Sequence, residues 1–312
     1  MLGYVCAYLR RYHPNEFIAS LLGNAANFDD TANATELASS RKTPIISARY
    51  GRSQGNYFYD AATGAITKGT GSIKHLNADS GKALYDLAHE KHHETFMELL
   101  LDINSRKILN ARQRDILIKL DFFEEYGNMK TLMELTHIFD FFKQGDAKTV
   151  KREQISDDTL HLYNGIADDK TKSGAPAKSL KILDMPELLR RFEAFVREKD
   201  LKDFTFKEKM ANQMEYLGYI DLVTGKEEDR RKLVVTDLMP LKSKKTGKVW
   251  TYIASARSIG SGRESRWNIR PSIYEYKTFR KGDILLCRKY STEHAKNGQD
   301  YLWLDVYDLV YD

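Results

Sequence analysis

Two short basic loops carry the residue types that bind phosphate groups. The first spans residues 69–78 and the second residues 105–112, and each leads into a predicted helix. Backbone N–H groups at the start of a helix have no partner within it, and the helix dipole adds positive charge there, so both loops favour an anion. Such contacts hold a nucleic-acid backbone without reading its sequence. The predicted contact residues are Lys68, Gly69, Gly71, Lys74, His75, Asn77 and Lys82 in the first region and Arg106, Lys107, Asn110 and Arg112 in the second.

A second concentration of positive charge lies near the C-terminus. Between Leu233 and Tyr290 there are thirteen basic and four acidic residues, and this surplus of nine exceeds the net charge of +5 of the whole chain. Clustered charge of this kind is typical of nucleic-acid binding. Aromatic residues are interleaved with the charges, and Trp267 is the best candidate for stacking on a base. The predicted contact residues are Lys244, Lys245, Lys248, Arg263, Arg266, Trp267, Arg270, Arg288 and Lys289.

Each pattern has a plainer interpretation. The two loops could be ordinary turns between helices with solvated lysines, because glycine-rich turns are common. The aromatic residues could pack the interior of a barrel. Trp303 and its neighbour Leu304, in the last strand-like run, are expected to lie in that core.

The predicted secondary structure that positions these residues changes along the chain from helices to strands. Helical spacing of apolar residues predicts helices in the first part, including a helix broken at Pro14. From Leu233 the apolar period becomes two, and five short strand-like runs separated by turn residues predict a small barrel of the oligonucleotide-binding (OB) type. The predicted helices are 4–24, 31–42, 78–90, 94–102, 111–121, 128–142, 185–199 and 205–217, with short strands at 45–46 and 56–59.

The cysteines and the hydropathy of the sequence indicate the subcellular location of the protein. Cys6 and Cys287 lie far apart and form no metal-binding or disulfide pattern. No apolar run approaches the roughly 20 residues of a membrane span, and the N-terminus has no signal-peptide pattern. We therefore expect a cytoplasmic protein without a membrane partner.

The order of these features resembles the C-terminal region of the bacterial DNA polymerase III alpha subunit, a family C replicative polymerase. The match covers roughly residues 4–142 and extends more loosely to 212–220 and to the barrel. The residues that carry it are Ala7–Phe17, which is like the family's AYLKxxYPxEF, Ser47–Ser53, Tyr57, Phe58, Gly69, Gly71, Ile73, Lys74, Asn110, Arg112, Leu117, Ile118, Lys119, Phe123 and Glu124.

The resemblance implies an α+β fold with a tandem helix-hairpin-helix region followed by an OB-type barrel. The expected domains are a fingers-like helical region with a short β-pair (1–60), the tandem helix-hairpin-helix domain (61–142), a linker (143–182), connecting helices (183–232) and the OB domain (233–312).

One departure concerns the first loop, residues 69–78, which would be the first hairpin of the tandem motif, as the second loop, residues 105–112, would be the second hairpin. Two glycines of the family's motif are replaced here by His75 and Asn77. Asparagine tolerates a left-handed backbone and histidine does so less readily. We therefore expect the first hairpin to bind phosphate less well or through its side chains, and the second hairpin is the safer prediction.

The resemblance also implies a function in DNA replication. The chain would hold primer–template DNA, with duplex and single-stranded DNA, the rest of the polymerase subunit and replisome components as its partners. In the family, the carboxylates that bind Mg²⁺ for nucleotide transfer lie in an upstream palm. We expect no catalytic residue, metal site or cofactor in this chain, which would be inactive as a polymerase on its own. Its carboxylate clusters, such as Asp157–Asp158, are expected to be solvated.

Two other interpretations stay open. The chain could be a stand-alone, non-catalytic DNA-binding accessory protein, or an RNA-binding OB protein with a helical scaffold. Met1 could mark a split gene, a fragment or an internal methionine.

Overall fold

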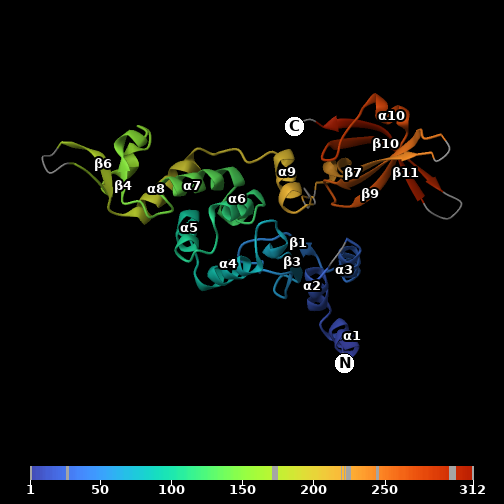
Figure 1. Ribbon diagram of the computed structural model, residues 1–312, viewed down its shortest axis with the longest axis horizontal. Helices are drawn as coiled ribbons and strands as arrows, with labels where there is room; N and C mark the ends of the chain where they lie inside the picture. The colour runs from blue at the N-terminus through green and yellow to red at the C-terminus, as the bar shows by residue number, and fades with distance from the viewer. Residues whose placement is uncertain are drawn as a thin grey trace. The chain divides into compact units, whose positions relative to one another are not determined.

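The computed structural model describes residues 2–25, 28–170, 175–218, 220, 222, 226–243, 246–294 and 300–310. The chain forms two compact units, Met1–Phe204 and Thr205–Asp312. Helices and short strands make up the first unit, and a closed five-stranded β-barrel dominates the second (Figure 1). The fold is mixed α+β with an OB-like barrel, as the sequence predicts.

The first unit begins with three helices and a small sheet. Its elements are α1 (Leu2–Tyr12), α2 (Pro14–Gly23), α3 (Phe28–Ser40), β1 (Ile45–Ile46), β2 (Phe58–Asp60) and β3 (Ala65–Thr67). The predicted break at Pro14 is confirmed, because this residue occupies the start of α2, where its missing N–H is tolerated. Ile18 and Leu22 of α2 pack with Ile66 of β3 in one small core. The sheet has the order β1-β3-β2.

Five further helices form the centre of this unit. They are α4 (Ala78–Glu90), α5 (Phe96–Ser105), α6 (Ala111–Lys119), α7 (Met129–Phe141) and α8 (Met185–Glu198). The residue before each of α4 to α7 is an asparagine or a threonine whose side chain accepts a hydrogen bond from a backbone N–H of the first turn. Fully buried phenylalanines, among them Phe96, Phe122, Phe123 and Phe139, fill the core.

The segment 143–182 is not the linker that the sequence predicts. It contains the strands β4 (Thr149–Lys151), β5 (Ala167–Lys170) and β6 (Pro176–Ile182), which form an antiparallel sheet in the order β4-β6-β5. Val150 and Leu180 are buried, and the ring of Tyr163 lies 5.9 Å from that of Phe192 in α8. The prediction was wrong because a small sheet exposes most of its residues, so its sequence has the polar composition of a linker.

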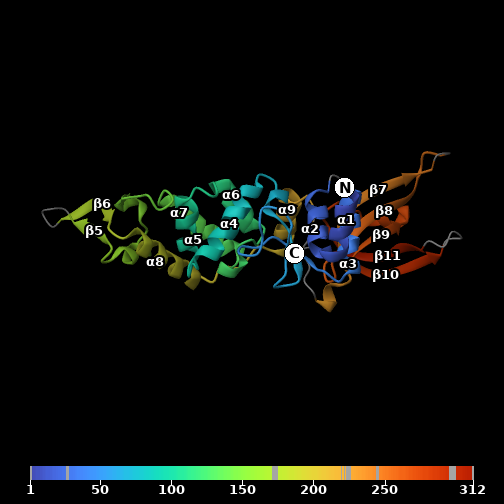
Figure 2. The same ribbon diagram turned by 90° about the horizontal axis from the view of Figure 1, so that it is seen from below.

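The second unit is built on the barrel. Its elements are α9 (Phe206–Tyr216), β7 (Lys232–Lys242), β8 (Val249–Ser258), β9 (Glu264–Ile269), α10 (Pro271–Tyr276), β10 (Ile284–His294) and β11 (Asp300–Val310). The strand order is β10-β11-β9-β8-β7, and β10 pairs with β7 to close the barrel. The pair β9–β11 is parallel and the other pairs are antiparallel. Figure 2 shows the β7–β8 and β10–β11 hairpins projecting from the barrel.

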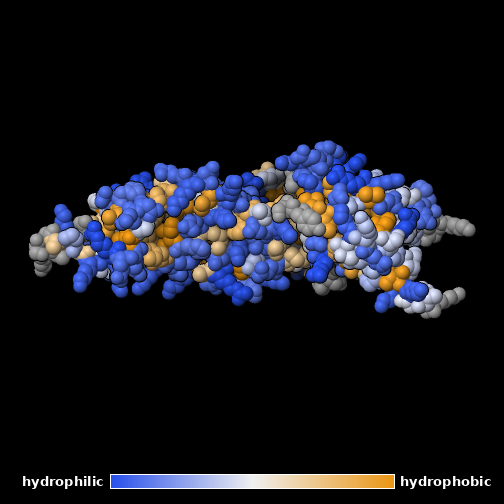
Figure 3. Space-filling view, turned by 90° about the horizontal axis from the view of Figure 1, so that it is seen from above, coloured by the Kyte–Doolittle hydropathy of each residue, from blue (hydrophilic) through white to orange (hydrophobic). Residues whose placement is uncertain are grey.

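Hydrophilic residues cover most of the face seen in Figure 3, and hydrophobic residues emerge there in separate patches. None of the helices in the described part of the chain has the length and apolar character needed to cross a membrane.

Candidate nucleic-acid interface

The two predicted basic loops have the same local construction. Each contains one non-glycine residue with a left-handed backbone, His75 with φ 68° and Lys107 with φ 54°. Each ends on an asparagine that caps the following helix. Asn77 accepts from the Ser80 N–H at 2.8 Å, and Asn110 accepts from the N–H of Gln113 at 2.9 Å. In the first loop His75 takes the left-handed backbone, whereas Asn77 is extended, with φ −125° and ψ 165°.

Side-chain hydrogen bonds join the two loops. Arg112 Nη2 donates to Nε2 of His75 at 2.9 Å, and Gln113 Nε2 donates to the carbonyl oxygen of His75 at 3.2 Å. Ser80 Oγ donates to the carbonyl oxygen of Ile108 at 3.1 Å. Residues of each helix start thus contact the opposite loop, so the N-terminal ends of α4 and α6 lie next to each other.

The two glycines of the first loop serve packing. A Cβ atom on the buried Gly69 would lie 2.4 Å from the carbonyl carbon of Asn56, although the backbone there (φ −84°, ψ 152°) suits any residue. The N–H of Gly71 donates to the carbonyl oxygen of Gly55 at 2.8 Å, so it is not available to a ligand. The Gly71 N–H is therefore engaged within the protein, and the presence of glycine at 69 is explained by the close approach of two backbones.

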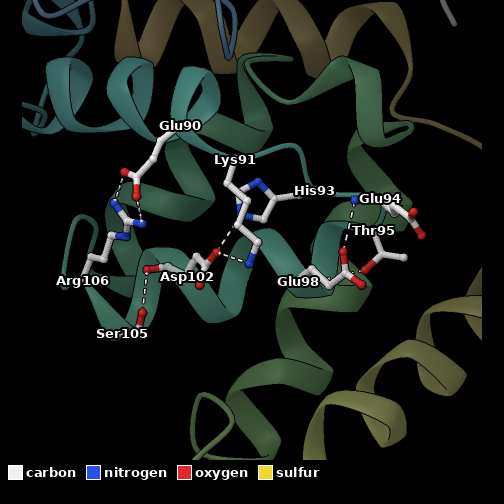
Figure 4. A network of polar contacts seen from close by, with 9 residues as sticks. All are labelled: Glu90, Lys91, His93, Glu94, Thr95, Glu98, Asp102, Ser105 and Arg106. Carbon is white, nitrogen blue, oxygen red and sulfur yellow. Dashed lines mark hydrogen bonds and ion pairs between the residues drawn. The ribbon is translucent and has the colours of Figure 1, made fainter.

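The basic side chains of the loops differ in their surroundings. Lys74, Lys82 and Lys107 are exposed and form no ion pair with any residue that the structure describes, whereas Lys68 is half-buried. Arg106 makes two hydrogen bonds to the Glu90 carboxylate, at 2.7 and 2.9 Å (Figure 4). Because its charge is already paired, Arg106 is a weaker candidate for DNA contact than the sequence suggests.

A polar network holds the second loop in place. Figure 4 shows Lys91 and His93 reaching the same oxygen of Asp102, each at 2.8 Å. Burial raises the pKa of the Asp102 carboxyl, but the hydrogen bonds from Lys91 and His93 more than offset this effect, and its pKa lies below the usual value. The network ties the turn after α4 to α5, the helix that leads into Lys107.

The N-terminus of α5 shows how this protein binds an anion at a helix start. Glu193 of α8 is buried, and its carboxylate accepts from the N–H groups of Phe96 at 3.1 Å and Met97 at 2.8 Å. Arg197 Nη2 donates to the same carboxylate at 2.6 Å. This helix start is therefore already occupied by the protein's own carboxylate.

The starts of α4 and α6 differ from α5. In the first turn of α4 the acidic residue Asp79 opposes a phosphate, whereas the first turn of α6 has no acidic residue and contains Arg112. Negative charge near a helix N-terminus competes with an incoming anion. The start of α6 is the better anion site of the two, which agrees with the sequence-based preference for the second loop.

Several predicted contacts on the barrel are engaged within the protein. Arg270 lies 5.3 Å from the ring of Trp303 and 3.2 Å from Asp305, and Arg288 pairs with Asp308 at 2.7 Å. Of the others, Lys248 and Lys289 are exposed, and Lys244 and Lys245 lie outside the described residues.

Trp267 is not the open stacking surface that the sequence predicts. Only 8% of its surface is exposed, it belongs to the barrel core, and its Nε1 donates to Ser265 Oγ at 2.7 Å. Leu304 is buried as predicted, but Trp303 is half-buried on the barrel surface. The period-two pattern puts Trp267 on one face of the sheet without saying which face is inside.

A basic cleft lies beside Trp267. It has a volume of about 660 Å³ and is lined by residues from the start of β7, the turn between β8 and β9, and the strands β9, β10 and β11. Sequence reasoning singled out Arg263 and Arg266 there but missed Arg231 and Tyr290. The consecutive arginines at 230 and 231, just before the first strand, were the available signal.

No family model and no curated protein matches the chain. Among the residues that the structure describes, no group of three or more histidine, cysteine, aspartate or glutamate side chains could hold a metal ion.

Proposed function

We propose that this chain is a DNA-binding C-terminal region of a replicative DNA polymerase large subunit, which holds primer–template DNA for an active site located elsewhere. The sequence resemblance over residues 4–142 supports the family, and the presence of an OB-like barrel after a helical region agrees with its domain order. In this proposal the two joined loops are a tandem helix-hairpin-helix, and the barrel contacts single-stranded template.

One observation carries the DNA-binding part of the proposal. The starts of α4 and α6 lie side by side, joined through His75 and Arg112, and the exposed side chains of Lys74 and Lys107 project from the same two loops. Two adjacent helix starts supply N–H donors and positive dipole ends for phosphates of a duplex backbone. Such contacts are independent of base sequence, as a replicative protein requires.

Charge reversal at the second loop tests this function. We expect the double variant Lys107→Glu/Arg112→Glu to lose affinity for primer–template DNA and to reduce the slope of log affinity against log salt by about 1.8, because each lost phosphate contact contributes about 0.9. Fluorescence anisotropy with a labelled duplex at two or more salt concentrations measures both quantities. Lys148→Glu/Lys178→Glu, which makes the same change of two charge reversals at exposed residues outside both loops, is the matched control.

Unchanged duplex affinity in the double variant would exclude the second loop from the interface. A loss of equal size in Lys148→Glu/Lys178→Glu would instead show a response to net charge alone.

A further inference from the structure

The basic cleft of the barrel has more positive charge than its carboxylates can neutralise. Arg231, Arg263 and Arg266 line it, and they form no ion pair within the described part of the chain. The two carboxylates in its lining are engaged with other partners, because Glu264 lies 3.8 Å from Arg257 and Asp300 pairs with His294. The three arginines thus line one cleft without an ion-pair partner among the described residues.

An aromatic ring stands at the edge of the same cleft. Tyr290 of β10 is 55% exposed, and its ring meets the buried ring of Trp267 edge-on, with centroids 5.7 Å apart and an interplanar angle of 83°. Trp267 is itself held by the core and by Ser265. Tyr290 is therefore braced from one side, and it presents the exposed aromatic surface that a base needs.

We propose that this cleft binds a nucleotide unit, with its phosphates on Arg231, Arg263 and Arg266 and its base against Tyr290. Guanidinium groups suit phosphate because their planar donors match its oxygens, and the cleft volume of about 660 Å³ accommodates a nucleotide. The inference deepens the proposed role of the barrel and rests on it. The nucleotide unit belongs either to a single strand or to a free nucleoside polyphosphate, since both present the same groups.

Titration of three ligands, each separately into the full chain, shows whether the bound nucleotide unit belongs to a single strand or is free, and whether its base contributes to binding. The ligands are a labelled oligo-dT, dATP and pyrophosphate, followed by anisotropy or calorimetry. Tight binding of oligo-dT with weak binding of dATP assigns the cleft to a single strand, and dATP binding that displaces oligo-dT assigns it to free nucleotides as well. Pyrophosphate that binds as tightly as dATP would overturn the base contact at Tyr290.

Variants of the lining test the site itself. Arg263→Gln and Arg266→Gln should each weaken binding roughly tenfold or more, because each removes a charged hydrogen bond. Tyr290→Ala should weaken it by roughly five- to a hundredfold, the range for loss of one stacked base, and Tyr290→Phe should retain binding. Arg288→Gln, on the same strand but paired with Asp308, is the matched control.

The results for the cleft variants can be distinguished from the results for the variant of the helical loops. The proposal is overturned if the cleft variants bind both oligo-dT and dATP as well as the unaltered chain does. If the Lys107→Glu/Arg112→Glu variant has normal duplex affinity while the cleft variants lose oligo-dT or dATP, the loops fail as a DNA interface and the cleft stands. If the double variant loses duplex affinity while the cleft variants bind normally, the loops stand and the cleft fails.

Discussion

A single carboxylate determines whether the N-terminus of a helix in the first unit can still bind an external anion. Glu193 occupies the start of α5 from a different helix, α8, so a group from far along the chain satisfies donors that would otherwise need water or a ligand. The comparable groups at α4 and α6 are local asparagine caps, which satisfy one N–H each. At α6 the side chain of Gln113 also accepts from the Asn110 N–H, so the N–H groups of Ala111 and Arg112 are the ones left open to an external anion.

Removal of the Glu193 carboxylate should destabilise the protein. We expect Glu193→Ala to reduce the free energy of unfolding by about 2–4 kcal/mol, because two buried N–H groups and the Arg197 guanidinium lose their acceptor. Urea denaturation of the first unit's transition measures this change. Glu198→Ala, an exposed residue of the same helix, should change stability by less than about 0.5 kcal/mol. Equal effects of the two substitutions would contradict the capping role.

The Asp102 network should respond to acid. The folded-state pKa of this carboxyl lies below its usual value because of the hydrogen bonds from Lys91 and His93, after the opposing effect of burial. A lowered pKa contributes stability above the unfolded-state value of about 3.9, and this contribution is lost as the pH falls through the folded-state value. The difference in unfolding free energy between the unaltered chain and Asp102→Asn should therefore shrink below about pH 4. Denaturation curves from pH 7 to pH 3 measure it, and a difference that stays constant with pH would refute the assignment.

At the level of elements, close packing explains features that looked like ligand contacts. The approach of the chain near Asn56 to Gly69, and of Ala78 to Gly55, leaves no room for a Cβ atom, with Cβ contacts of 2.4 and 2.1 Å. The Gly-x-Gly of residues 69–71 is thus explained by its close approach to the backbone of Gly55 and Asn56. The same caution applies to the barrel, where the sequence pattern alone could not distinguish the buried Trp267 from the half-buried Trp303.

Substitution of Gly69 separates packing from phosphate binding. We expect Gly69→Ala to lower the unfolding free energy by about 1–3 kcal/mol or more, the range for an overpacked interior. In Gly3→Ala, the matched control in α1, the added Cβ meets nothing within 4 Å, and the change should be neutral or stabilising. Thermal melting of both variants gives the comparison. A Gly69→Ala protein of normal stability but weakened DNA affinity would restore the phosphate-binding interpretation.

For the whole molecule, charge distribution predicts a strong dependence of DNA affinity on salt. Lys74, Lys82, Lys107 and Arg112 offer up to four phosphate contacts in the helical unit, which corresponds to a slope of about −3.6 in log affinity against log salt. Titration of primer–template DNA over a salt series measures this slope. A slope near zero would exclude binding through the phosphate backbone.

Much of the element order could be predicted because its signals are local. Proline at the start of α2, asparagine and threonine caps, and the change of apolar period near Leu233 act within a few residues. The eight predicted helices lie close to their predicted ranges, and five barrel strands follow the change of period, most of them longer than predicted. The sheet of residues 143–182 could not be predicted in this way. Its strands are short and mostly exposed, so pairing between distant strands creates the structure and composition does not reveal it.

The candidate sites, too, could be predicted in part from local sequence and in part only from the tertiary structure. Composition and spacing were enough to place basic residues in two loops and on the barrel. Charge clusters and helix-start motifs consist of residues that are neighbours in the sequence, so they can be recognised without the tertiary structure. Contacts between residues far apart in the chain decided the rest. They determine whether an arginine is paired, whether a glycine is needed for packing, and whether an aromatic ring is exposed. Arg106 meets Glu90, Tyr290 meets Trp267, and Glu193 meets the start of α5 only after folding, because side-chain partners are chosen by tertiary packing.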